Sequence, residues 1–201
     1  MIHSRLLLAT NNKGKVREYK ALLSGIPYEI ITMAEQGIAI DVDETGESFE
    51  ENARLKATTL AKESGLLTLA DDSGLEVDAL GGEPGVLSHR YAGEDVSDAD
   101  RYLFLLEKLK DIPEEKRTAK FRCVIALATP DGTIELCSGE CRGVITMSPK
   151  GEQGFGYDPV FYLPELGKTM AELSTKEKNR ISHRARAVEK VRVVLMKRHR
   201  I

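Results

Sequence analysis

Two short apolar segments with a helical segment between them open the chain, and this order constrains the fold more than any other feature. Arg5–Thr10 is an apolar run bounded by polar turn residues, which is typical of a buried strand. Over Gly14–Leu23 apolar side chains recur at helical spacing, and Gly25 ends the pattern. Tyr28–Thr32 predicts a second strand. A strand–helix–strand unit of this kind predicts an α/β protein with a parallel or mixed sheet.

The rest of the chain supplies further strands and helices. Pro130-Asp131-Gly132 between two apolar segments is a strong hairpin signal, and arms of about 35 Å are long enough to span two lobes. Since no repeat or flexible linker interrupts the sequence, we expect one bilobal α/β domain over residues 1–201. The other expected elements are a helix over Glu47–Ser64, a strand LLTLAD that stops at two aspartates, a helix from Ser97 to about Lys110, hairpin arms over Ala119–Thr129 and Thr133–Ile145, and a helix from Ser182 onward.

Composition excludes several classes of protein. With 41% hydrophobic and 30% charged residues and no long low-complexity tract, the chain is predicted to be globular rather than disordered. No apolar run approaches the ~18 residues needed to cross a bilayer, so we expect no membrane segment and a cytoplasmic location. The three cysteines are an odd number, and reduced structural thiols are the expected state.

Charge is distributed unevenly along the chain. Residues 40–51 hold six acidic side chains and no basic one, whereas residues 176–200 hold ten basic side chains against two acidic ones. A divalent cation at the acidic segment and an anionic ligand at the basic segment would suit this distribution. Two solvated helix faces are the alternative interpretation, and charge alone favours it.

The turn after the first strand has the layout of an anion site. In LLLATNNKGKVREY, Lys13 and Lys15 follow a strand and begin a helix, whose N-terminal amides attract anions. The segment is not a Walker A loop, because Ala9 and Val16 replace the glycine and hydroxyl residue which that loop requires. A pair of solvated lysines is the alternative interpretation.

Two adjacent carboxylates, Asp71 and Asp72, end the predicted strand LLTLAD. Ligands of α/β proteins bind near the carboxyl ends of strands, and Mg²⁺ prefers carboxylate and phosphate oxygens. Neighbouring side chains point to opposite sides of an extended chain, so the two aspartates should have different roles. A polar turn is the alternative, since D-D-S-G is also a common turn composition.

Two later segments could contact a nucleotide. In G-E-Q-G-F-G-Y-D-P-V-F, residues 151–161, glycines flank aromatic residues that could stack on a base or enter the core. In S-T-K-E-K-N-R-I-S-H-R, residues 174–184, Lys178 could reach a phosphate, and His183 and Arg184 offer hydrogen-bond donors. Ordinary surface charge is the alternative for this second segment.

Taken together and in this order, these stretches resemble the inosine triphosphate pyrophosphatase family, also called the dITP/XTP pyrophosphatases. Each motif alone is weak, but the ordered set covers nearly the whole chain. The motifs are E-T-G at 44–46, F-x-E-N-A-x-x-K-A at 49–57, D-D-S-G-L-x-V-D-x-L-G-G-x-P-G at 71–85, R-Y-A-G at 90–93, G-F-G-Y-D-P-x-F at 154–161 and S-H-R at 182–184.

The resemblance implies a fold, a reaction and an assembly. Members of the family have an elongated mixed β-sheet flanked by helices, with two lobes and a central active-site cleft, and are usually homodimers. They hydrolyse purine nucleoside triphosphates such as ITP, dITP and XTP to the monophosphate and pyrophosphate, with Mg²⁺ as cofactor. This activity removes non-standard nucleotides before polymerases use them.

The resemblance also implies roles for individual residues. Glu44 and Asp72 match magnesium ligands, and Asp72 also matches the proposed general base. Because a bound cation lowers the basicity of a carboxylate, Asp71 stays a candidate for one of these two roles. The positions that match substrate contacts are Thr10, Asn11, Asn12, Lys13, Gly14 and Lys15 in the phosphate-binding turn, Lys56 and Lys178 for phosphate, Ser73, Phe155, Gly156, Tyr157 and Asp158 in the base-binding segment, and His183 and Arg184 for the base edge.

The chain departs from the family pattern at Asn11, where the turn usually carries glycine. If that glycine has a positive φ, asparagine is the residue that tolerates the conformation best. The rival function is a non-catalytic nucleotide- or RNA-binding module that uses the basic C-terminal helix. The acidic positions Glu44 and Asp72 would serve no purpose in such a module, so we expect an enzyme without a stable nucleic-acid partner.

Overall fold

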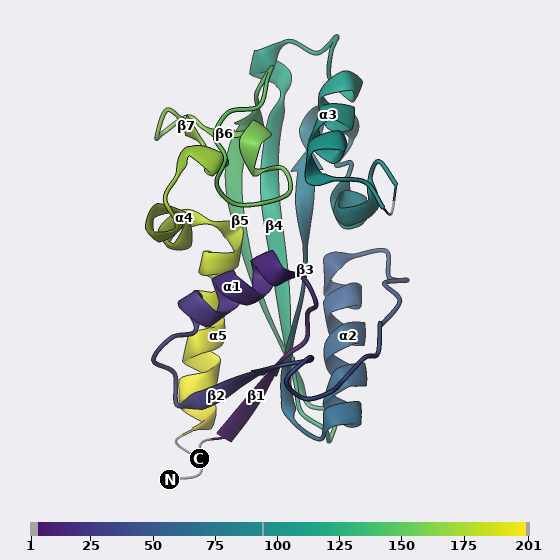
Figure 1. Cartoon of the computed structure of the whole chain (residues 1–201), viewed down its shortest axis with the longest axis vertical. Helices are drawn as coiled ribbons and strands as arrows, with labels where there is room; N and C mark the ends of the chain where they lie inside the picture. The colour runs from purple at the N-terminus through teal and green to yellow at the C-terminus, as the bar shows by residue number, and fades with distance from the viewer. Residues whose placement is uncertain (1–3, 94, 200–201) are drawn as a thin grey trace. The chain divides into compact units, whose positions relative to one another are not determined.

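The strands form one mixed β-sheet, as the opening strand–helix–strand pattern predicts. Within residues 4–93 and 95–199, which the computed structural model describes, seven strands follow the order β2-β1-β3-β4-β5-β6-β7 (Figure 1). β1 is parallel to β2 and β3, whereas β6 is antiparallel to β5 and β7. The strands are β1 Ser4–Leu8, β2 Tyr28–Thr32, β3 Leu67–Val77, β4 Thr118–Ala128, β5 Ile134–Ile145, β6 Phe161–Leu163 and β7 Lys168–Thr169.

Helices accompany this sheet, so the predicted α/β class is confirmed. The α-helices are α1 Lys13–Leu22, α2 Phe49–Ser64, α3 Asp98–Lys108, α4 Thr175–Ile181 and α5 His183–Arg198. Short 3₁₀ helices lie at Asp78–Leu80, Gly85–Arg90, Glu114–Lys116, Asp158–Val160 and Met170–Glu172.

The chain folds into two compact units, and the boundary between them falls within β3, β4 and β5. The first unit holds the chain up to Asp72, Cys123–Gly139 and the chain from Arg184 on. The second unit holds Ser73–Arg122 and Glu140–His183. The long hairpin arms therefore contribute residues to both units, as their length predicts. One bilobal domain over residues 1–201 stays a prediction.

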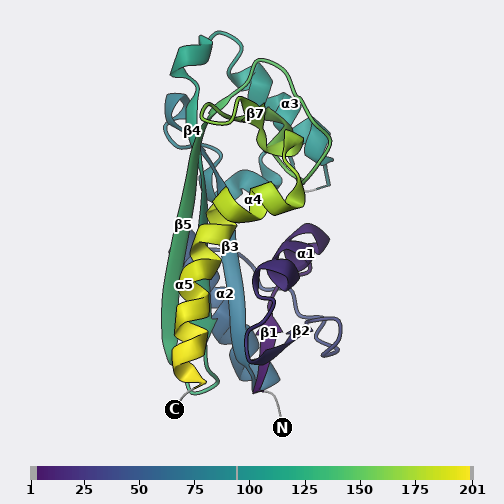
Figure 2. The ribbon, with the colours of Figure 1, turned by 90° about the vertical axis from the view of Figure 1, so that its left-hand side faces the viewer.

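In the first unit, helices cover both faces of the sheet. α1 and α5 pack on one face of β1 and β3, and Figures 1 and 2 show α2 on the opposite side of these strands. Side chains alternate along a strand, so Leu7 of β1 points away from the α1 side and is also fully buried. The cluster on the α1 side includes Leu6, Leu8, Tyr19, Leu23, Leu69, Cys123, Val188 and Val191.

Local signals in the sequence fix both ends of α2. The Ser48 side chain accepts a hydrogen bond from the backbone N–H of Glu51, which caps the helix N-terminus. Gly65 ends the helix in the left-handed conformation, with φ 67°. These caps set the register of α2 and therefore place its polar residues Asn52 and Lys56.

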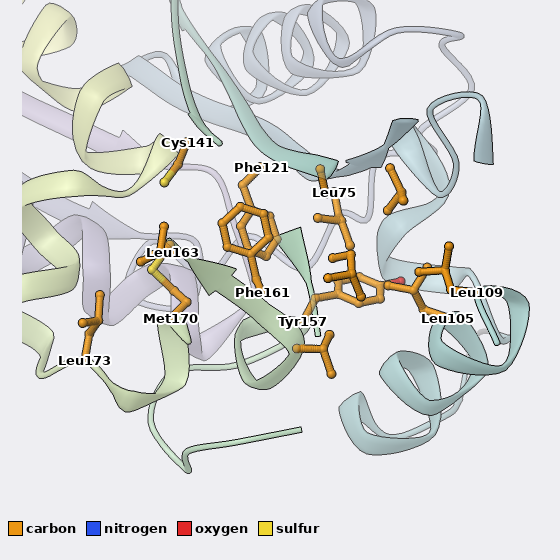
Figure 3. Packing of buried hydrophobic residues seen from close by; sticks show 14 residues of the cluster. Leu75, Leu105, Leu109, Phe121, Cys141, Tyr157, Phe161, Leu163, Met170 and Leu173 are labelled. Carbon is orange, nitrogen blue, oxygen red and sulfur yellow. The ribbon is translucent and has the colours of Figure 1, made fainter. Parts of the chain in front are cut away.

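The second unit has its own core, around two tilted aromatic rings. The rings of Phe121 and Phe161 lie 4.4 Å apart, and Figure 3 shows them between Cys141 and Leu75. The remaining members come from β3, α3, β5 and the segments around β6, and they include Leu105, Leu109, Tyr157, Leu163, Met170 and Leu173.

The prediction that the third strand stops at the aspartates is wrong. β3 continues through Asp71 and Asp72 to Val77, and both aspartates are buried. A strand can contain them because buried cations and an amide compensate their polar oxygens, so no turn is needed to expose them to water. The helix that begins after Ser97 ends at Lys108, and β6, β7 and α4 were not predicted.

The cysteines and the helices bear on two further predictions, reduced thiols and no membrane segment. Cys123, Cys137 and Cys141 are buried thiols without a disulfide, as expected. Within the part of the chain that the structure describes, none of the helices has the length and apolar character that a bilayer span requires. Arg200, which belongs to the predicted basic tail, lies outside the described residues.

We predict that Phe161→Ala destabilises the protein, because it leaves a cavity beside Phe121 in a fully buried position. The free energy of unfolding in urea should fall by about 3–5 kcal/mol. Leu166→Ala is the matched control, since Leu166 is 48% exposed. Its effect should stay within about 0.5 kcal/mol, and equal effects of the two variants would contradict the described core.

Candidate active site

Side chains of the turn before α1 hold its backbone in place and leave N–H groups available to a ligand. The Asn12 side chain caps the helix by accepting a hydrogen bond from the N–H of Lys15, at 3.0 Å. Thr10 Oγ1 accepts a hydrogen bond from the N–H of Asn12, at 3.2 Å. Among the described residues, the N–H groups of Lys13 and Gly14 have no acceptor within the protein. The turn can therefore hold an anion at the positive end of α1.

Asn11 needs no special backbone conformation in this turn. Among the described residues, only glycines adopt a positive φ. Asn11 thus replaces the family's usual glycine with an ordinary negative φ. The tolerance of asparagine for the left-handed conformation plays no part here. The path of the turn depends on the hydrogen bonds of Thr10 and Asn12 instead.

Asp71 lies at the centre of a buried group of charges in the first unit. Its Oδ2 is 3.0 Å from Lys15 Nζ and 3.6 Å from a terminal nitrogen of Arg184. Burial alone would raise the pKa of Asp71, but Lys15 and Arg184 hold it well below its usual range. Asp71 is therefore an anion that fixes the two cations.

Arg184 is itself held by two carboxylates. Its NH1 group donates to Glu18 Oε2 at 2.5 Å, while Asp71 lies on its other side. The guanidinium also lies 5.6 Å from the ring centre of Tyr19. Burial opposes the charge of Arg184, but Glu18 and Asp71 outweigh it and raise the pKa of the guanidinium. α1, β3 and α5 are thus joined by one ionic network.

Asp72 points to the opposite side of β3, as adjacent residues in a strand must. Asn52 Nδ2 donates to Asp72 Oδ2 at 2.9 Å, and Asn52 Oδ1 accepts from the N–H of Gly46 at 2.8 Å. The fully buried Asn52 therefore connects Asp72 to the loop that carries Glu44. A Cβ atom at Gly46 would lie 2.7 Å from Asn52 Oδ1, which explains the glycine in E-T-G.

The sequence interpretation did not assign Asn52. A signal was present, because Asn52 falls on the same face of α2 as the buried residues Phe49, Ala53 and Ala57. A polar side chain within an apolar helical stripe needs a buried partner. The identity of that partner could not be read from the helix alone.

Lys56 connects the loop of Glu44 with strand β3. Its ammonium group donates to Glu44 Oε1 at 2.5 Å and to the backbone carbonyl of Asp71 at 2.6 Å. Burial lowers the pKa of Lys56, but the charges of Asp71, Glu44 and Asp72 outweigh this effect and raise it. Lys56 therefore stays a cation beside Glu44, a predicted metal ligand.

The carboxylates of Glu44 and Asp72 fit the requirements of a divalent cation. Burial and the negative charge of Glu44 raise the pKa of Asp72 to about 6. A cation beside them would relieve this repulsion. Among the described residues, no cluster of three or more His, Cys, Asp or Glu side chains is placed to hold a metal. Two carboxylates, with water and substrate phosphates as further ligands, match the usual demand of Mg²⁺.

The second unit contains another group of predicted site residues. Asp158 Oδ2 accepts from the N–H of Phe155 at 2.9 Å and from Lys178 Nζ at 2.5 Å. The Lys178 ammonium group lies 4.8 Å from the centre of the Phe155 ring. Gly154 has φ +80°, and a Cβ atom there would lie 2.0 Å from Asp158 Oδ2. Glycine is therefore required for this close packing.

The other predicted residues of this unit have supporting contacts. Tyr157 is buried in the core, and its hydroxyl donates to the carbonyl of Ser88 at 2.9 Å. His183 is buried and stacks on Phe121, with ring centres 4.8 Å apart. Ser73 follows Asp72 in β3 and is partly buried.

The predicted site residues thus fall into two groups, one in each compact unit. The first unit gathers the turn from Thr10 to Lys15, Glu44, Lys56, Asp72 and Arg184. The second unit holds Ser73, Phe155, Gly156, Tyr157, Asp158, Lys178 and His183. Lysines at a helix N-terminus near paired carboxylates are an arrangement that suits phosphate groups and a divalent cation.

Comparison with known proteins identifies the family. The chain belongs to the Ham1 family, whose model matches residues 6–194. It is 47% identical to the dITP/XTP pyrophosphatase of Bacillus licheniformis over 190 residues, which are 94% of this chain and 97% of the relative. Identity to the dITP/XTP pyrophosphatase of Desulforamulus reducens is 50% over 191 residues, 95% of each chain. The family prediction is confirmed.

A solved structure supports the same assignment at the level of the fold. The HAM1 protein from Coxiella burnetii matches this structure with a TM-score of 0.89 at 43% sequence identity. The match covers 96% of this chain and 99% of that one.

We predict opposite stability effects for the two adjacent aspartates. Asp71→Asn removes the buried counter-charge of Lys15 and leaves Arg184 with Glu18 alone, so the free energy of unfolding at pH 7 should fall by about 3 kcal/mol. Asp72→Asn removes a carboxylate whose ionisation is unfavourable, so stability should rise by about 1–3 kcal/mol. Urea unfolding of both variants measures the difference.

The pH dependence of these effects follows from the shifted pKa values. Asp72 stays protonated in the folded protein up to about pH 6, but ionises near pH 4 when unfolded, so it costs stability as pH rises through this range. The advantage of Asp72→Asn should vanish below about pH 4. Asp71 contributes stability above about pH 4 and loses that contribution as pH falls. Equal profiles for both variants would contradict the described environments.

Proposed function

We propose that this protein is a nucleoside triphosphate pyrophosphatase that hydrolyses the non-standard purine nucleotides ITP, dITP and XTP. The products are the nucleoside monophosphate and pyrophosphate. The observation that carries the proposal is that the two adjacent aspartates have different surroundings. Asp71 fixes the cations Lys15 and Arg184, while Asp72 lies on the other side of β3 with Asn52 and near Glu44.

The lysines and the N-terminus of α1 would bind the triphosphate. Lys15 and Lys56 are held by Asp71, through its carboxylate and its backbone carbonyl respectively, so their ammonium groups are positioned before substrate arrives. The N–H groups of Lys13 and Gly14 add neutral donors to the same region. Preorganised donors of this kind stabilise charge that develops during phosphoryl transfer.

Magnesium is the cofactor that the donor set suits best. Glu44 and Asp72 would hold it, and bound Mg²⁺ neutralises phosphate oxygens and stabilises the pyrophosphate leaving group. Asp72 is the better candidate for orienting the attacking water. The carboxylate of Asp71 is engaged by Lys15 and Arg184 and therefore has a structural and electrostatic role.

Base recognition is assigned to Phe155 with its loop, and to His183 and Arg184. Phe155 lies between two glycines and would stack on the purine. Hypoxanthine and xanthine carry a carbonyl where adenine carries an amino group, so a buried donor discriminates between them by roughly 10⁴-fold. Arg184 is fixed by Glu18 and is a donor of this kind.

The basic C-terminal helix does not favour the rival binding module. Arg192 donates to the carbonyls of Leu22 and Ser24, and Arg198 contacts Glu135. These contacts engage both side chains within their own unit and fasten α5 there. A homodimer in the cytoplasm without a stable nucleic-acid partner stays our prediction for the assembly and its location.

The direct test is a panel of nucleotides with pyrophosphate as the readout. With Mg²⁺, purified protein should release pyrophosphate from ITP, dITP or XTP far faster than from ATP or GTP. Chelation of the metal should abolish turnover, and added Mg²⁺ should restore it. Release of orthophosphate, or nucleotide binding without turnover, would contradict the proposal.

Asp72→Asn tests the assignment of the catalytic carboxylate. Turnover should fall by at least about 10²-fold, because this variant loses the general base and a charged metal ligand. The expected gain in stability separates this loss from misfolding. Near-normal turnover of the variant would remove Asp72 from the mechanism.

A further inference from the structure

An aspartate outside every predicted motif contacts the segment predicted to bind the base. Asp98 is the first residue of α3, and its Oδ2 accepts a hydrogen bond from the N–H of Gly156 at 2.7 Å. Gly156 directly follows Phe155 in the loop between β5 and β6. Figures 1 and 2 show this loop beside α3. The contact joins two segments of the second unit that are 58 residues apart in the sequence.

The side chain of Arg101 orients the carboxylate of Asp98. Its Oδ1 accepts a hydrogen bond from Arg101 NH1 at 2.7 Å. The Arg101 residue is 5% exposed, and its NH2 group donates to the carbonyl of Val96 at 3.1 Å. A buried guanidinium fixed at a second point restricts the rotation of the aspartate. The positive end of α3 also favours a carboxylate at this position.

Two glycines flank Phe155 in its loop, whose own backbone restraint includes a hydrogen bond from the N–H of Asp158 to the carbonyl of Phe155 at 3.4 Å. Gly154 and Gly156 both have positive φ, at +80° and +63°, and glycine has more backbone freedom to lose than any other residue. Asp158 anchors the N–H of Phe155 from within the loop, at 2.9 Å. Asp98 anchors the next N–H from outside. Phe155 is therefore held between two carboxylates that bind consecutive backbone amides.

We propose that Asp98 is a positioning residue that fixes the backbone after Phe155 and so prepares its ring to stack on the purine. This inference rests on the proposed function, because it assigns the base to Phe155. A ring that is already in place does not pay its ordering cost when substrate binds. Asp98 acts through the loop backbone, and Arg101 acts through Asp98.

Hydrogen exchange without nucleotide tests the contact itself. In Asp98→Ala the amide of Gly156 should exchange about tenfold faster, since a hydrogen bond to a charged acceptor is lost. Asp98→Asn should have an intermediate effect. Its single oxygen can accept from Gly156 or from Arg101, whereas aspartate satisfies both.

Asp100→Ala is the matched control. Asp100 lies in the same first turn of α3 and contacts the capping residue Ser97. It makes no contact with the loop among the described residues. This variant also loses a helix N-terminal carboxylate, but exchange at Gly156 should stay as in the wild-type protein.

Steady-state kinetics with Mg²⁺ test the role in binding. For ITP or XTP, KM of Asp98→Ala should rise about five- to tenfold with kcat within about twofold, because stacking stabilises bound substrate and transition state alike. Asp98→Asn should lie between Asp98→Ala and wild type. Asp100→Ala should keep both constants.

Several outcomes would overturn the inference. Unchanged exchange at Gly156 in Asp98→Ala would show that the contact does not restrain the loop. Faster exchange with unchanged KM would show that the restraint does not serve binding. Equal effects of Asp98→Ala and Asp100→Ala would assign the loss to the helix terminus. The proposed function is tested separately, by the wild-type protein. If the wild type releases no pyrophosphate from any purine triphosphate, the proposed function is wrong, whatever the Asp98 variants do.

Discussion

The ion pairs of Asp71 are the interactions on which the first unit depends most. A buried carboxylate between Lys15 and Arg184 joins the N-terminus of α1, strand β3 and the start of α5. Removing charges from water is costly, so such a network persists only when every member has partners of opposite sign. Glu18 supplies the remaining counter-charge for Arg184. The same requirement places Lys15 of the turn before α1, so the proposed phosphate site and the stability of the unit depend on one set of contacts.

Asp72 shows how a neighbouring residue acquires the opposite character. The two aspartates share a strand and are both buried, but the cations around Asp71 outweigh its burial, whereas at Asp72 burial and the negative charge of Glu44 outweigh the charge of Lys56. Their pKa values consequently shift in opposite directions. We propose that one carboxylate contributes stability and the other takes part in catalysis, and the alternation of side chains along β3 separates them.

Local sequence patterns predicted much of the framework. The opening strand–helix–strand unit, the C-terminal end of α2 and the hairpin around Asp131 are set by periodicity and by residues with strong turn or capping preferences. The start of α2 was predicted at Glu47, but the helix begins at Phe49 after its cap Ser48. β3 was predicted to end too early, because two aspartates are rare inside a buried strand unless distant cations compensate them. The family was also predicted correctly, since its motifs are ordered along the chain. Asn52 and Asp98 were missed because their partners, Gly46 with Asp72 and Gly156, come together only through folding.

The sequence by itself determined the α/β class, the family and the identity of the charged residues available for chemistry. It also determined that Asp71 and Asp72 face opposite ways, because that follows from the geometry of any strand. Only the tertiary structure decided which aspartate meets the cations, that Asn52 connects Asp72 to the loop of Glu44, and that Asp98 restrains the loop of Phe155. Hydrogen bonds and charge pairs act over a few ångströms, and no local pattern states which distant residues folding will bring within that range.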